Sequence, residues 1–138
     1  MLELWTLRIP RCGLLVLAAL LAGVDSVYGD EREPFFSAQV EPVLRNRCYG
    51  CHSHEAGEMK GGLTLDSRSG WEVGGDTGPA IIPGNLEKSL LIAAVERGEL
   101  KMPPDEALPA AEVEILKKWV SEGAFDARVA KASAPPSS

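Results

Sequence analysis

The sequence predicts a small all-α domain with about three main helices and long glycine-rich loops. Three segments of the 138-residue chain repeat apolar residues every three or four positions, as amphipathic helices do. Between residues 52 and 85 lie eight of the fourteen glycines, which predicts loop and turns, with one weak helix beginning near Asp66 or Ser67. The run 80–82 is the one candidate for an extended segment.

The first helix is expected from about Pro34 to the residue before Cys48. Its apolar face carries Phe36, Val40, Val43 and Leu44. Pro34 suits a first helical turn, where an amide donor is not needed. Pro42 lies in the interior, so we expect a kink or a break there.

Two further helices follow the glycine-rich segment. One is expected at about Leu86–Arg97, with Asn85 as its cap and Gly98 as its end. The other is expected at about Ala110–Glu122, and Gly123 should end it. Both carry broad apolar faces, so both should pack into the core.

The N-terminus has the pattern of an export signal. Arg8 and Arg11 precede an apolar stretch at 14–24 that is short for a membrane span, which needs about 20 apolar residues. We expect cleavage after Gly29, which also removes Cys12. The alternative is an uncleaved membrane anchor.

The chain contains one Cys-x-x-Cys-His motif, at residues 48–52. This motif is typical of c-type haem attachment: Cys48 and Cys51 would form thioethers with the haem vinyl groups, and His52 would bind the iron as the proximal ligand. Haem is attached to such motifs outside the cytoplasm, which agrees with the export signal. We therefore expect one covalent haem c per chain.

A zinc site and a thioredoxin-type redox site are the alternatives for this motif, and the sequence fits both less well. A zinc site would need four ligands, and Cys48, Cys51, His52 and His54 are crowded into seven residues without a second pair elsewhere. A thioredoxin-type redox site would need a strand before the motif and a helix starting at it. His54 is interpreted as a surface histidine.

A second iron ligand should come from farther along the chain. Met59 and Met102 are the methionines that remain after the leader. Met102 precedes two prolines that favour an extended loop, so we predict it as the distal ligand, whereas Met59 should be a loop residue. A carbonyl of Pro79 or Pro83 could accept from the His52 ring.

The organisation that follows is a signal peptide at 1–29, a haem domain at 30–124 and an Ala/Pro/Ser-rich tail or linker at 125–138. Cleavage would remove two basic and two acidic residues, so the net charge stays at −6. This charge argues against nucleic acid and against an anionic membrane surface as partners. It permits docking to redox protein partners, basic ones included.

The chain resembles the planctomycete-type cytochrome c domain, a relative of the mono-haem class I cytochromes c. The resemblance is carried by residues 40–44, 48–53, 60–67, 74–84, 89–92, 102–104 and 119–124. It implies a small all-α haem fold in which the first and last helices cross near Trp119 and a methionine loop closes the distal face. In this family the domain usually opens a much longer exported protein.

These observations predict an exported or periplasmic one-electron carrier that is not an enzyme. One alternative is a haem enzyme or gas sensor with an open sixth position at the iron. Another is a haem-containing electron-entry module of a larger extracytoplasmic oxidoreductase, of which this chain would be a part.

Overall fold

The structure is a computed structural model that describes residues 30–57 and 59–128. Within these residues the fold is all-α, as predicted, and an isolated bridge between Gly75 and Gly78 is its one strand-like pairing. The segment 80–82 forms no strand. No described helix is both long and apolar enough to cross a membrane. The predictions made for residues 1–29 and for the end of the tail lie outside the described residues.

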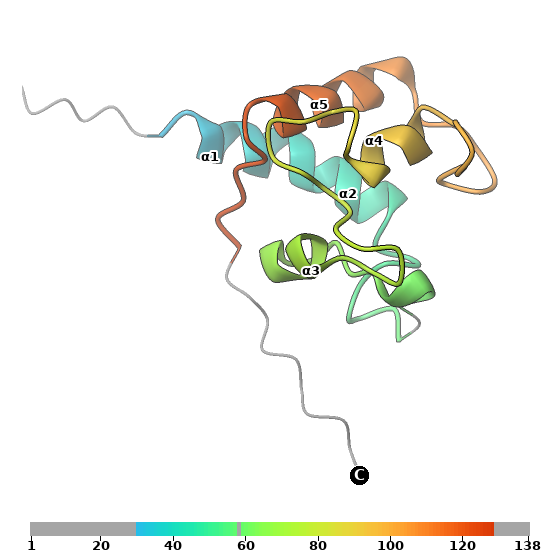
Figure 1. Ribbon diagram of the computed structural model, residues 1–138. Coiled ribbons are helices and arrows are strands. Elements are labelled where there is room, and N and C mark those ends of the chain that lie inside the picture. The colour runs from blue at the N-terminus through green and yellow to red at the C-terminus, as the bar shows by residue number, and fades with distance from the viewer. Residues whose placement is uncertain (1–29, 58, 129–138) are drawn as a thin grey trace, which may run out of the picture.

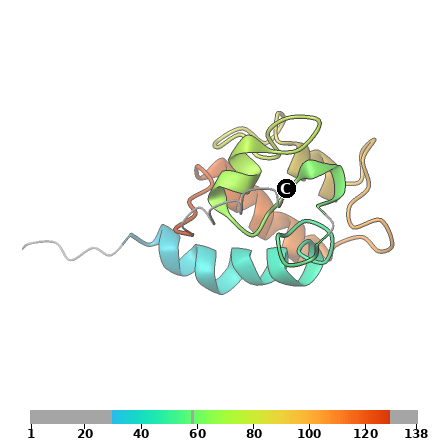
Figure 2. The same cartoon turned by 90° about the horizontal axis from the view of Figure 1, so that it is seen from below.

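The N-terminal helical segment is built from three consecutive parts. These are α1 (Arg32–Phe35), the π-helical η1 (Phe36–Val40) and α2 (Glu41–Arg47). The backbone keeps right-handed helical angles at both junctions, and Figure 2 shows one unbroken helical run.

Of the kink or break expected at Pro42, the break does not occur, and the irregularity found there is the preceding π-helical turn. Pro42 has no amide hydrogen, and in a regular α-helix its ring would meet the carbonyl of Ala38. The wider π-helical turn lies directly before it and relieves both problems, because its hydrogen bonds skip one more residue.

The last helix, α5 (Ala110–Ser121), lies across this N-terminal segment (Figure 1). The ring centroids of Phe36 and Trp119 are 5.7 Å apart at the crossing, which confirms the predicted contact of the terminal helices. Trp71 meets Trp119 edge-on at 5.9 Å, so Trp119 connects both helices to the middle of the chain. Gly123 has a φ of +99° and follows the end of α5, as predicted.

The weak helix predicted near residue 67 is α3 (Arg68–Val73). The hydroxyl of Ser67 accepts from the amide of Gly70 at 3.1 Å, which satisfies a free donor at the helix start. Trp71 is buried on α3 and carries this segment into the core.

The remaining helix, α4 (Leu90–Val95), begins four residues later than predicted. Asn85 does cap a turn, because its side chain accepts from the Lys88 amide at 2.9 Å. The Ser89 hydroxyl then donates to the Asn85 carbonyl at 2.6 Å and accepts from the Ile82 amide at 2.9 Å. These bonds hold 86–88 as a separate turn, so the helix starts after Ser89.

The end of α4 also differs from the prediction. Arg97, not Gly98, takes the left-handed conformation, with a φ of +59°. The amides of Arg97 and Gly98 donate to the carbonyls of Ala94 and Ala93, at 3.2 and 3.1 Å, in a Schellman arrangement.

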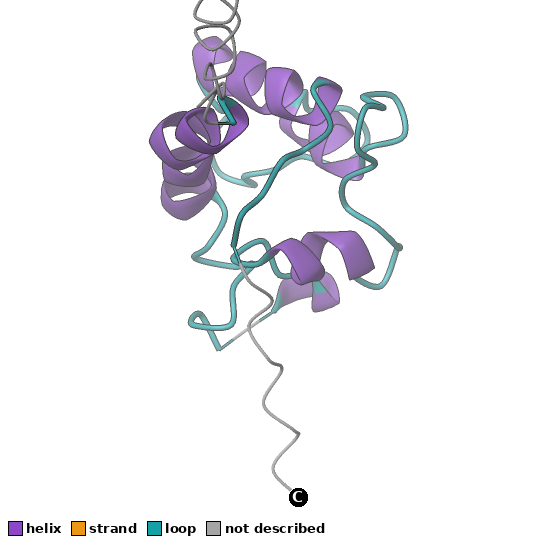
Figure 3. Cartoon of the chain, turned by 90° about the vertical axis from the view of Figure 1, so that its left-hand side faces the viewer, coloured by secondary structure: helices purple, strands orange, loops and turns teal. Residues whose placement is uncertain are grey.

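Two stretches of the glycine-rich middle lie against each other, and they belong to the loops and short helical turns that Figure 3 draws in teal and purple. The short 3₁₀ turn η2 (Lys60–Gly62) lies against 75–76, where the Asp76 amide donates to the Gly61 carbonyl at 2.8 Å. A Cβ added to Gly75 would lie 2.1 Å from that carbonyl oxygen. The close approach that requires glycine here is between two stretches of this chain's own backbone.

The ordered fold continues past the predicted domain end at residue 124. Phe125 packs partly against the core, Asp126 is buried, and Arg128 contacts three separate segments. These residues belong to the packed domain.

Candidate functional site

The Cys-x-x-Cys-His motif follows directly from the last turn of α2. The Cys48 amide donates to the Leu44 carbonyl at 2.9 Å. The Cys48 carbonyl in turn accepts from the amides of Cys51 and His52, at 3.1 and 2.9 Å. One tight turn therefore brings the two cysteines and the histidine together at the end of α2.

Both cysteines of the motif are free thiols and half-buried. Burial, together with the negative charge of Glu112, raises the pKa of Cys48 to about 12. A reactive redox cysteine has a low pKa instead. The motif also follows a helix and has no strand before it, which weighs against the thioredoxin-type interpretation.

His52 is tied to the domain through its backbone. Its carbonyl accepts from the Leu65 amide at 2.8 Å. Its ring atom Nδ1 is buried and has no hydrogen-bond partner among the described residues. The expectation that Pro79 or Pro83 accepts from this ring nitrogen is therefore wrong, and none of residues 30–57 and 59–128 satisfies it.

His54 lies at the surface, as predicted. Its Nδ1 pairs with an Asp66 carboxylate oxygen at 2.8 Å, and its amide donates to the other oxygen at 3.0 Å. Within the described residues no three His, Cys, Asp or Glu side chains gather closely enough to hold a metal ion. The crowded four-residue zinc set therefore does not converge.

Met102 lies in the loop between α4 and α5, and 39% of its surface is exposed to solvent. The Met102 amide donates to the Ala94 carbonyl at 3.1 Å, and the Arg97 side chain donates to the Pro103 carbonyl at 3.1 Å. The loop is thus fastened to the end of α4 at two points on either side of the methionine side chain. Met59 lies in a loop and is 48% exposed.

Several residues around the motif were not predicted as part of it. Tyr49 lies inside the motif, and the Arg128 guanidinium donates to its hydroxyl. The Asp126 carboxylate accepts from that arginine on the other side, and it also accepts from the Trp71 indole. The signal was present in the sequence, since an aromatic residue and two opposite charges at 125–128 interrupt the composition of the tail.

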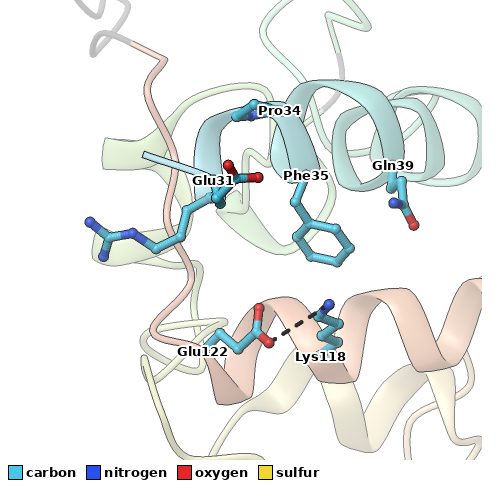
Figure 4. A pocket seen from close by; sticks show the side chains of 7 residues that line it. Glu31, Pro34, Phe35, Gln39, Lys118 and Glu122 are labelled. Atoms are coloured by element: carbon cyan, nitrogen blue, oxygen red, sulfur yellow. Dashed lines mark ion pairs between the residues drawn. The ribbon is translucent and has the colours of Figure 1, made fainter. Parts of the chain in front are cut away.

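A cavity of about 460 Å³ lies away from the motif, between α1 and α5 (Figure 4). It is lined by Glu31, Arg32, Pro34, Phe35, Gln39, Lys118 and Glu122. The Lys118 ammonium lies 4.7 Å from the centre of the Phe35 ring and 3.8 Å from a Glu122 oxygen. None of the predicted site residues lines this cavity.

Residues 48–106 match the model of a protein family described as Planctomycete cytochrome C. The match begins at the first cysteine of the motif and includes Met102, whereas the N-terminal helices and α5 lie outside it. Among curated proteins and among solved structures, nothing matches the chain.

Proposed function

Residues 48–106 are a cytochrome c domain of the planctomycete type, and on this premise we propose that the protein is an exported mono-haem electron carrier. A cytochrome c domain binds haem and transfers electrons. The finer statements, one covalent haem per chain, export and transfer of one electron at a time, are the proposal. No enzymatic activity is assigned to it.

The residues of the motif fit the group. Two free thiols and an imidazole from one turn are the donor set of covalent haem attachment. The observation that carries the proposal is the tight turn after α2, in which the Cys48 carbonyl accepts from the amides of Cys51 and His52 and so keeps two free thiols and an imidazole on one short stretch of chain. Cys48 and Cys51 would hold the porphyrin, and His52 would bind the iron.

Haem c supplies an iron that changes reversibly between the ferric and ferrous states. The chain supplies its surroundings. A fastened loop offers the thioether of Met102, a soft ligand suited to haem iron. The exposed apolar residues of the described chain include Met59, Leu100 and Met102, which an apolar prosthetic group could cover.

Export is supported by the sequence pattern of the leader and by the extracytoplasmic attachment of c-type haem. The proposed mature chain starts at Asp30 and acts in the periplasm or another exported location, without strong membrane association. Its net charge of −6 is compatible with basic redox proteins as partners.

One observation favours a second candidate. Met102 is 39% exposed on a loop, and a ligand held in this way could be displaced from the iron. The domain would then act as a sensor, or as the electron-entry module of a larger oxidoreductase, with a sixth position that opens.

The first test is visible spectroscopy of protein matured with haem-attachment machinery. We expect a c-type spectrum and haem that survives acid-acetone extraction, because two thioether bonds would hold it. Extractable haem in the matured wild type would contradict covalent attachment.

The Met102→Ala variant tests the sixth ligand. We expect it to lose the weak red-edge sulfur-to-iron absorption of the ferric state, to bind carbon monoxide readily and to have a lower reduction potential. Met59→Ala is the matched control and should change none of these. A wild type that lacks the band and already binds carbon monoxide quickly would favour the sensor or module.

A further inference from the structure

Asp126 is a buried carboxylate whose hydrogen-bonding capacity is filled. Its side chain is fully inaccessible to solvent. One oxygen accepts from the Arg128 amide and from its Nε, both at 2.9 Å. The other accepts from Arg128 Nη2 at 2.6 Å and from the Trp71 indole at 2.9 Å. The bidentate pair with Arg128 fixes the plane of the guanidinium.

The remaining donors of Arg128 reach two other segments. Its Nη1 donates to the Tyr49 hydroxyl and to the Leu65 carbonyl, the latter at 3.0 Å. The guanidinium also lies 5.0 Å from the centre of the Phe36 ring. The Asp126 carboxylate binds the Nε and Nη2 edge of the guanidinium, so the Nη1 edge is directed toward Tyr49 and Leu65.

The two residues that accept from Arg128 Nη1 are both connected to the motif at residues 48–52. Tyr49 stands between the two cysteines of the motif. Leu65 is bonded at both of its backbone groups: its carbonyl accepts from Arg128, and its amide donates to the His52 carbonyl at 2.8 Å. Leu65 therefore connects Arg128 to the backbone of the predicted proximal histidine. A side-chain route and a backbone route thus lead from one guanidinium to the motif.

We propose that Arg128, oriented by Asp126, is a positioning residue for the proximal haem ligand. This inference rests on the proposed function, since it assumes that His52 binds haem iron. The His52 ring has no hydrogen bond from Nδ1 to fix its orientation. Its orientation then depends on how firmly the backbone on either side is held, and Tyr49 and Leu65 are the points at which Arg128 holds it.

The arrangement also gives a role to the residues between the end of α5 and Arg128. Residues 125–128 bring a cation to the motif and, with it, the carboxylate that offsets its charge. A buried arginine with only neutral partners would pay a large desolvation penalty, and the Asp126 pair reduces that penalty.

The test uses holoprotein matured with haem and carrying Tyr49→Phe or Arg128→Lys. The first substitution removes the hydroxyl and keeps the ring; the second keeps the charge and removes the planar fork. The readout is the electron paramagnetic resonance spectrum of the ferric protein, which reports the orientation of the axial ligands. We expect a second set of g values, which comes from a minor orientation of the axial ligand. The population of this orientation should be about tenfold higher in the variants than in the wild type.

Val120→Ala is the control, because Val120 is buried in α5 and takes no part in the Asp126 and Arg128 contacts. It should lower stability and leave one set of g values. If Tyr49→Phe and Arg128→Lys match Val120→Ala at equal loss of stability, the contacts are merely structural and the inference is wrong, whereas the proposed function stands. Extractable haem in the wild type would overturn both.

Discussion

The crossed helices and the loops of residues 48–80 contrast in what holds them. At the crossing of the N-terminal segment with α5, the contacts are between apolar side chains, and Leu44, Leu116 and Val120 are completely buried. In the loops the long-range contacts are backbone hydrogen bonds, such as those from Lys60 to Cys51 and from Leu65 to His52. Apolar packing stabilises by burial alone, whereas such loop bonds replace bonds to water and contribute little net free energy.

This difference explains where the haem would matter most for folding. The helix pair contributes most of the large side chains of the one core cluster around Trp119. Residues 48–80 contribute few large buried side chains to this cluster, of which Leu65 and Trp71 are the main ones. A covalently bound apolar group between the cysteines would supply the packing that the loops lack.

The largest expected effect follows from removing that group. Protein carrying both Cys48→Ser and Cys51→Ser should be largely unfolded, because a ligand bound only by the native state supplies folding free energy. Circular dichroism at increasing temperature measures this. A cooperative melt close to that of the holoprotein would show that the helix pair and loops are stable without haem.

The next effect tests the helix crossing. Trp119→Ala should lower the free energy of unfolding of the holoprotein by about 3–5 kcal/mol, because it empties a buried site that touches Phe36 and Trp71. Leu100→Ala is the control at a residue that is 46% exposed, and it should cost less than about 0.5 kcal/mol. Guanidinium denaturation measures both, and equal losses would contradict the division between core and loops.

A smaller effect tests the loops. Gly75→Ala should cost about 1–3 kcal/mol, because its Cβ would meet the Gly61 carbonyl oxygen and push two loop segments apart. Gly123→Ala is the comparison, because a Cβ at Gly123 would meet no other atom and the strain would come from the positive φ alone. That strain should lower the free energy of unfolding by about 1–2 kcal/mol. The two variants should differ in haem spectra: only Gly75→Ala should disturb them, and an unperturbed spectrum would mean that these loops do not support the motif.

The same contrast sets what the sequence could predict. Helical repeats located the crossed helices, because apolar periodicity reports the buried face directly, and Gly123 marked the end of α5. Ser67 was recognisable near the start of α3 for a similar local reason. The π-helical turn before Pro42 was not predictable, since it depends on the helix being held in place by tertiary packing on both sides.

The late start of α4 shows the limit of local signals. Asn85 is a good cap by residue type, and it does cap a turn. What ends that turn is the Ser89 hydroxyl bonding to Ile82, a contact between segments whose approach no local pattern encodes.

The site divides in the same way. Cys48, Cys51 and His52 stand in a contiguous motif, so their identity could be read from spacing. The role of Arg128 depends on a fold that returns the end of the chain to the motif, across 79 residues from Tyr49. The aromatic residue and the opposite charges at 125–128 set this stretch apart from the tail, but they do not indicate which segment it contacts.

The smallest predicted effect is the pH dependence that the charge of the Asp126 carboxylate gives to stability. Burial alone would raise the pKa of Asp126, but the hydrogen bonds from Arg128 and Trp71 outweigh burial, so the pKa lies below the ordinary value of 3.8. A carboxyl group with a lowered pKa in the folded state contributes stability above its unfolded pKa and loses it as the pH falls through the folded pKa. At neutral pH the wild type should therefore be more stable than Asp126→Asn, which leaves Arg128 without its counter-charge.

The gap between the two proteins should stay constant down to about pH 4 and narrow below 3.8, as the wild-type carboxyl takes up its proton. Protonation of groups that the substitution leaves in place affects both proteins and cancels in the difference. Urea denaturation of both holoproteins between pH 7 and pH 2 measures it. A gap that stays constant to pH 2 would mean that the Asp126 charge contributes nothing to stability, and that the residue acts through its shape and neutral hydrogen bonds.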